Sequence, residues 1–114
     1  MLSEVSYLEI GTKDIGSSRP FFEQLLGWTF HAMGQDGEGW FQTPSIRAGL
    51  HGNDPNPQLL IFFSVADLTA AVAQVKALGG EADESSADEP GFGRFCLCRD
   101  PQGIHFGLHQ RPQA

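Results

Sequence analysis

The sequence repeats itself with a period of about 55 residues, and this repeat restricts the fold more than any other feature. Matched residues keep the same order in both halves, at shifts of 53, 54 and 58 residues that change only where turns are expected. The matched pairs are Asp14 with Asp67, Gly27 with Gly80, Gly37–Phe41 with Gly91–Phe95, and Gly49–His51 with Gly107–His109. Several weak matches in register indicate a duplicated structural module.

The first half predicts a strand, a helix and three short strands. β-Forming residues over 5–12 predict the first strand. Ser17 or Ser18 is expected to cap a helix that has Pro20 in its first turn and ends at Gly27. The apolar stripe expected along this helix consists of Phe21, Phe22, Leu25 and Leu26. The short strands are expected near 28–33, 38–43 and 46–51.

The second half predicts the same order of elements. A strand over 59–65 leads to a helix that Asp67 caps and Gly79-Gly80 ends. Strands near 80–84, 92–98 and 103–109 complete the set. The expected fold class is therefore α+β, with two βαβββ modules in tandem at residues 1–53 and 54–114, inside one domain spanning residues 1–114.

Strand alternation separates an apolar face from a mixed one. The apolar parity, expected to pack under the helices, consists of Leu8, Ile10, Ile46, Ala48, Leu50, Ile61, Phe63, Val65, Ile104, Phe106 and Leu108. The other parity consists of Tyr7, Glu9, Gly11, Arg47, Gly49, His51, Leu60, Phe62, Ser64, His105, Gly107 and His109. Glycines near strand centres among polar groups favour a cleft for a small molecule, and a solvated sheet surface is the alternative.

Three segments resemble the vicinal oxygen chelate superfamily of glyoxalases, extradiol dioxygenases, fosfomycin-resistance enzymes and bleomycin-resistance proteins. They are YLEIGTKDIGSSRPFFEQLLGWTF at the start, VADLTAAVAQVKALGG in the middle and GFGRFCLCRDPQGIHFGLHQ at the end. The resemblance covers essentially the whole sequence. It implies the glyoxalase/bleomycin-resistance/dihydroxybiphenyl-dioxygenase-like fold, and it is closest to the small members that lack a metal site.

The resemblance also identifies four positions at which metal-dependent members carry a His or Glu ligand. In this sequence they are Tyr7, Gly49, Leu60 and Gly107. Only Tyr7 among them can ligate, and tyrosine is a rare ligand, so we expect no metal and no cofactor. A displaced divalent-metal site built from Glu9, His51, His105 and His109 is the alternative.

Polar residues of the mixed face are the candidates for ligand binding, and no catalytic residue is assigned. The expected pocket residues are Tyr7, Glu9, Arg47, His51, Phe62, His105 and His109. Glu9 either forms an internal ion pair with Arg47 or accepts a hydrogen bond from the ligand, with general-base catalysis as a further alternative. Trp40, Phe30 and Phe62 offer stacking surface or core packing, and His31 is expected to be exposed without a partner.

We therefore expect a metal-free protein that binds a small molecule, and a homodimer. An enzyme of the same fold (a lyase, isomerase or dioxygenase using a displaced metal or acid/base chemistry) is one alternative. An antibiotic-sequestering resistance protein is another. The acidic run at 81–89 is a solvated loop or, at a cleft rim, a feature that favours a cationic ligand.

Charge and cysteine content restrict location and partners. Seven basic against fourteen acidic residues give a net charge of −7, which argues against nucleic acid and anionic membranes. No apolar run is long enough to cross a membrane, and the N-terminus has no basic region of a signal peptide. Cys96 and Cys98 are expected to be buried thiols in a reducing cytoplasm.

Overall fold

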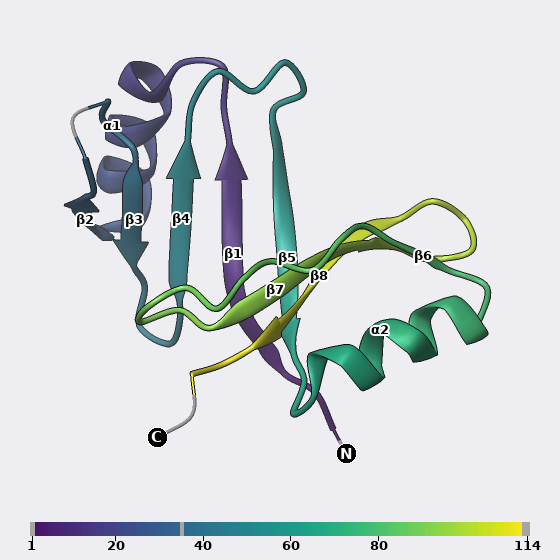
Figure 1. Cartoon of the computed structure of the whole chain (residues 1–114). Coiled ribbons are helices and arrows are strands. Elements are labelled where there is room, and N and C mark those ends of the chain that lie inside the picture. Colours follow the sequence, from purple (N-terminus) through teal and green to yellow (C-terminus); the bar gives the residue numbers. More distant parts are fainter. Residues whose placement is uncertain (1, 35, 113–114) are drawn as a thin grey trace. The chain divides into compact units, whose positions relative to one another are not determined.

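The computed structural model describes residues 2–34 and 36–112, and the chain divides into two compact units. One unit is Tyr7–Leu60, and the other combines Met1–Ser6 with Ile61–Ala114. The element order along the chain is strand, helix and three strands, given twice (Figure 1). The α+β fold of two βαβββ modules is thus confirmed.

The first module forms a four-stranded sheet with one helix. Its elements are β1 (Val5–Gly11), α1 (Ile15–Leu26), β2 (Thr29–Ala32), β3 (Gly39–Gln42) and β4 (Arg47–His51). The strand order is β2-β3-β4-β1, in which β1 and β4 are parallel and the other pairs antiparallel. In Figure 1, α1 lies behind β2 and β3.

The second module repeats this arrangement. Its elements are β5 (Gln58–Ser64), α2 (Leu68–Ala77), β6 (Glu81–Ala82), β7 (Arg94–Arg99) and β8 (His105–Gln110). The order is β5-β8-β7-β6, with β5 and β8 parallel. The strand expected over 80–84 is reduced to the two residues of β6.

Each helix covers the apolar parity of its own sheet, as the alternation predicts. In the first module the buried core is Ile10, Phe41, Ala48 and Leu50, and in the second it is Leu68, Cys96, Cys98 and Leu108. Two residues of the predicted set, Ile61 and Ile104, are exposed. Ile104 is exposed because it belongs to the turn before β8, where Asp100 Oδ1 accepts hydrogen bonds from the Gln102 and Ile104 amides.

The cysteines are free and buried, as expected. Their Sγ atoms lie 3.9 Å apart on one face of β7, with no disulfide between them. Burial, followed by the neighbouring Cys96 thiol, raises the pKa of Cys98 to about 12. Both thiols therefore act as small core side chains.

The predicted start of α1 is wrong by three or four residues, since the expected cap was Ser17 or Ser18. Asp14 is the cap, in an extended conformation, and its Oδ1 accepts a hydrogen bond of 3.0 Å from the Gly16 amide. Ser18 cannot cap because its hydroxyl lies 2.7 Å from that of Thr12. Pro20 consequently lies inside the helix rather than in its first turn, while Gly27 ends the helix with a positive φ, as expected.

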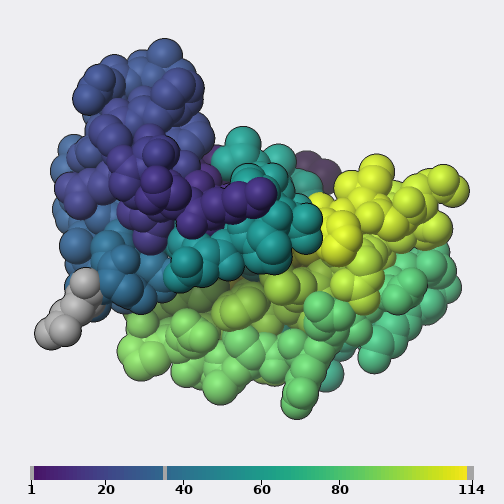
Figure 2. Space-filling model, turned by 90° about the horizontal axis from the view of Figure 1, so that it is seen from above, coloured from purple at the N-terminus to yellow at the C-terminus, as the bar shows by residue number. Residues whose placement is uncertain are grey.

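Of the four residues predicted for the apolar stripe of α1, only Phe22 packs against the core. Ile15 and Phe22, seven residues apart, pack against the core, and Arg19 between them lies over the Phe30 ring at 4.2 Å. Phe21 and Leu25 are 59% and 64% exposed. Figure 2 shows the blue-purple residues of α1 at the surface of this module.

The cap can be tested by substitution. We expect Asp14→Ala to lower the free energy of unfolding by about 1 kcal/mol, because the Gly16 amide loses its acceptor. Ser17→Ala is the matched control and should change it by less than about 0.5 kcal/mol, since Ser17 only donates to Asp14. Urea denaturation measures both, and a larger loss in Ser17→Ala would contradict the assignment.

Candidate functional site

The strand register brings polar and aromatic residues together on one face of the first module. Glu9 lies opposite Gly49, Gly49 opposite Trp40, and Trp40 opposite His31, in one row across β1, β4, β3 and β2. Directly opposed residues project to the same side of a sheet. We call this side the polar face, and it is the side away from the apolar core.

Four side chains on or beside the polar face form a continuous hydrogen-bonded group. The Tyr7 hydroxyl donates to Glu9 Oε1 at 2.9 Å, and Glu9 Oε2 lies 2.6 Å from His51 Nδ1. The other ring nitrogen of His51, Nε2, lies 3.1 Å from Asp54 Oδ2. We call Tyr7, Glu9, His51 and Asp54 the Glu9 cluster.

The Glu9 cluster holds His51 between two carboxylates. Burial alone would lower the pKa of His51, but hydrogen bonds and charge attraction from Glu9 and Asp54 outweigh it, so the pKa lies above its ordinary value of 6.5. The pKa of Asp54 is lowered by the Asn56 amide and then by His51. Asp54 was not predicted as a site residue, although its position three residues after His51 is a usable signal.

Two glycines make room for the cluster. A Cβ atom at Gly49 would collide with the Tyr7 hydroxyl and the Glu9 carboxylate. A Cβ atom at Gly11 would collide with the Asp54 carboxylate and lie 2.8 Å from His51 Nε2. Glycine at the centre of β4 and at the end of β1 is therefore required by the side chains above it, not by backbone conformation.

The predicted ion pair between Glu9 and Arg47 is wrong. The parallel register places Arg47 opposite Tyr7 and Glu9 opposite Gly49, so Glu9 bonds within its cluster. Arg47 instead lies over the Trp40 ring, 4.0 Å from its centroid.

His31 is exposed, as expected, but it does have a partner, because its ring stacks on Trp40 at 4.2 Å. The Trp40 side chain thus contacts residues from both neighbouring strands, β2 and β4. Phe30, which was a candidate for ligand stacking, packs against Phe41 in the core instead.

The candidate residues of the second module have different surroundings. His109 is 5% exposed; its Nε2 donates to the Phe92 carbonyl at 2.7 Å and its Nδ1 lies 2.9 Å from the Ser6 hydroxyl. Burial lowers the pKa of His109, which favours a neutral structural ring. Phe62 packs against the backbone of Gly107, whereas His105 is exposed at the start of β8.

The four positions at which the resemblance implies metal ligands do not fit a divalent ion. The Tyr7 hydroxyl and Glu9 fill the space above Gly49, and the Phe62 ring fills the space above Gly107. Leu60 has no donor atom. Across residues 2–34 and 36–112, no three His, Cys, Asp or Glu side chains are grouped as a metal site would require.

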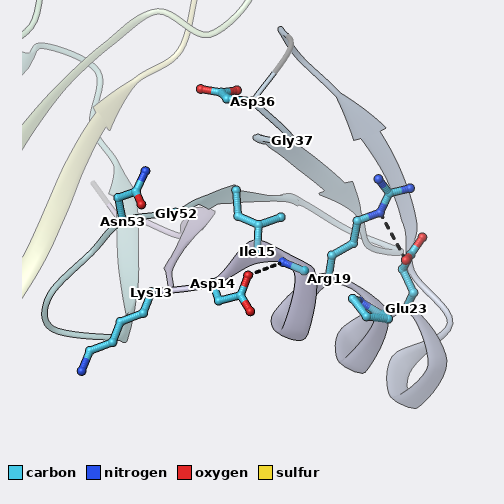
Figure 3. Close-up of a pocket in the computed structure, with 11 residues that line it drawn as sticks. Lys13, Asp14, Ile15, Arg19, Glu23, Asp36, Gly37, Gly52 and Asn53 are labelled. Carbon is cyan, nitrogen blue, oxygen red and sulfur yellow. Dashed lines mark hydrogen bonds and ion pairs between the residues drawn. The ribbon is translucent and has the colours of Figure 1, made fainter.

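A separate hollow of about 630 Å³ surrounds the start of α1 (Figure 3). Its lining residues are Lys13, Asp14, Ile15, Gly16, Arg19, Pro20, Glu23, Asp36, Gly37, Gly52 and Asn53. Three of its charged groups already have partners, because Asp14 caps the helix and Arg19 pairs with Glu23 at 3.3 Å. The polar face, where an exposed arginine and an exposed histidine contact one tryptophan, is therefore the stronger candidate site.

Comparisons with known proteins agree with the resemblance found in the sequence. The family model of the Glyoxalase/Bleomycin resistance protein/Dioxygenase superfamily matches residues 4–108. The anthracycline biosynthesis protein DnrV of Streptomyces peucetius is 25% identical over 127 residues, which cover 93% of this chain and 46% of DnrV. The chain thus spans about half the length of this curated relative.

Solved structures show the same fold at low identity. Methylmalonyl-CoA epimerase from Mycobacterium tuberculosis has a TM-score of 0.72 at 16% identity, over 96% of this chain and 88% of that one. Homoprotocatechuate 2,3-dioxygenase from Arthrobacter globiformis has a TM-score of 0.75 at 20% identity, over 96% and 36% respectively. Among the described helices, none is long and apolar enough to cross a membrane.

The raised pKa of His51 predicts how its ring titrates. In an NMR titration of the histidine Cε1 protons, we expect the pKa of His51 to exceed 6.5 and to fall in Glu9→Gln, which removes a negative charge at 2.6 Å. The charged His51 ring should stabilise the folded state fully below pH 6.5, and this contribution should be lost as the pH rises through the higher pKa of the folded state. His109 is the internal control, with a pKa below 6.5 in both proteins.

The requirement for glycine at position 49 gives a second test. We expect Gly49→Ala to lower the free energy of unfolding by roughly 1–3 kcal/mol, because Tyr7 and Glu9 must move. The pKa of His51 should fall with it. Gly16→Ala is the control and should cost less than Gly49→Ala, because its Cβ would lie 3.3 Å from Asp14 Oδ1, a milder contact, and alanine is favoured within α1. Unchanged stability and an unchanged pKa in Gly49→Ala would contradict the proposed packing.

Proposed function

We propose that this chain, which belongs to the Glyoxalase/Bleomycin resistance protein/Dioxygenase superfamily, binds a small organic molecule on its polar face without a divalent metal. The observation that carries the proposal is the Glu9 cluster over Gly49, where side chains with fixed hydrogen bonds replace a metal ligand. The name of DnrV, an anthracycline biosynthesis protein, supports an organic molecule as the ligand.

The polar face offers both kinds of contact that such a ligand needs. The Glu9 carboxylate, which the cluster holds in place, supplies a hydrogen-bond acceptor, and the edge of the Trp40 ring between His31 and Arg47 supplies apolar surface. The side chains of Glu9 and His51 are 24% and 39% exposed, so a ligand can still reach them. Tyr7, Glu9, Arg47 and His51 therefore remain in the proposed site, joined by Trp40.

The second module contributes less to this proposal. Both ring nitrogens of His109 have protein partners, and Phe62 is buried against Gly107. These contacts support structural roles. His105 is exposed, and its role in ligand binding stays a prediction.

Location and assembly are part of the same proposal. The buried free thiols of Cys96 and Cys98 support a reducing location such as the cytoplasm. The exposed apolar residues Phe21, Leu25 and Leu26 of α1 support a homodimer.

An acid/base enzyme of the same superfamily is the second candidate, and the 2.6 Å contact between Glu9 and His51 favours it. A carboxylate oriented by an imidazolium can accept a proton from a carbon next to a carbonyl group. Exchange of that ligand proton in D₂O, followed by NMR and lost in Glu9→Gln, would distinguish the enzyme from a binding protein.

A fragment panel tests the binding proposal. With chelator present, we expect fragments to shift the amide signals of Trp40, Gly49 and His51 in ¹H–¹⁵N NMR spectra. Glu9→Gln should weaken binding about tenfold or more, because a charge-assisted hydrogen bond is lost.

Glu23→Gln is the matched control, because Glu23 is a carboxylate beside the α1 hollow and not on the polar face. The proposal would be overturned if fragments bound only after a divalent metal was added. It would also be overturned if Glu23→Gln abolished fragment binding while Glu9→Gln left it unchanged.

A further inference from the structure

Among the described residues, Arg47 forms no ion pair with a carboxylate. Arg19, Arg99 and Arg111 each form one with a glutamate or aspartate, and Arg94 donates to the Ser86 carbonyl. Within the part of the chain that the structure describes, Arg47 has no such pair, even though acidic residues outnumber basic ones fourteen to seven. An exposed arginine that is left unpaired in an acidic protein is available to an external anion.

Trp40 fixes the position of this cation. The Arg47 guanidinium lies 4.0 Å from the centre of the Trp40 ring, and His31 stacks on the same ring from β2. When a guanidinium stacks on an aromatic ring, its N–H groups point outward, parallel to the ring, where a second planar group can accept hydrogen bonds from them. Less conformational entropy is then lost when an anion binds.

The charges of the polar face favour a single negative charge on the ligand. The carboxylates of Glu9 and Asp54 lie on either side of His51, whereas Arg47 contributes a positive charge that no carboxylate of the described residues pairs with. A dianion such as a phosphate would be opposed by the nearby carboxylates, whereas a carboxylate matches one guanidinium fork.

We propose that the ligand is an organic carboxylate whose carboxylate group binds to the N–H edge of Arg47 on its Trp40 support. The inference rests on the proposed binding function and identifies its ligand class. The remaining polar atoms of the ligand then lie toward Glu9 and His51.

Two probes of the same shape test this charge preference. 2-Naphthoate carries a carboxylate, and 2-naphthamide carries a neutral amide of nearly the same size. The full-length protein is titrated with each, and the Trp40 indole N–H signal reports binding in ¹H–¹⁵N spectra. The Trp28 indole, which packs in the core, is the internal control.

We expect 2-naphthoate to bind at least tenfold more tightly than 2-naphthamide. Arg47→Gln should remove this difference, and Arg47→Lys should retain only part of it because lysine lacks the planar fork. Arg19→Gln is the matched control and should keep the full difference, since Arg19 also lies over an aromatic ring, at 4.2 Å from Phe30, but belongs to α1.

Three results would overturn the inference: equal affinity for the two probes, a preference that survives Arg47→Gln, or no binding of 2-naphthoate. If neutral or cationic fragments of the panel above still bind the polar face, only the carboxylate inference fails. If no fragment binds that face, the proposed function fails as well.

Discussion

The contact between Glu9 and His51 is the interaction on which the rest of the candidate site depends. At 2.6 Å it joins a carboxylate and an imidazole from two parallel strands, and Tyr7 and Asp54 extend it at either end. The contact is possible only because position 49 has no side chain. The glycine on β4 therefore permits the contact that raises the pKa of His51, two residues further along the same strand.

The same geometry explains why this member of the superfamily can use its sheet differently from one that binds metal. Above Gly49, the Tyr7 hydroxyl and the Glu9 carboxylate are hydrogen-bonded to each other and to His51. Metal ligands would instead have to point toward one common position for the ion. Arg47, released from the carboxylate that could have neutralised it, lies on Trp40. The hydrogen bond between Glu9 and His51 thus keeps the Glu9 cluster ordered and leaves Arg47 exposed on the same face.

The sequence allowed most of the fold to be predicted, because the repeat, the strand alternation and Gly27 depend on local chemistry. The start of α1 was misplaced because Asp14, Ser17 and Ser18 all have capping side chains, and only the folded chain distinguishes them. Ser17 donates to Asp14, and the hydroxyls of Ser18 and Thr12 bond to each other. The partner of Glu9 was misassigned because parity fixes a face but not a register. Asp54 lies outside any strand, so no periodicity could have indicated it.

The histidines at the matched positions 51 and 109 have become chemically unlike since the module was duplicated. In one copy two carboxylates stabilise the charged ring, and in the other burial favours the neutral ring. One sequence repeat thus supports two opposite histidine environments, because the residues around each ring, and not its place in the module, decide which form is favoured. Substitutions around His51 in residues 7–60 can therefore change its titration without touching the environment of His109.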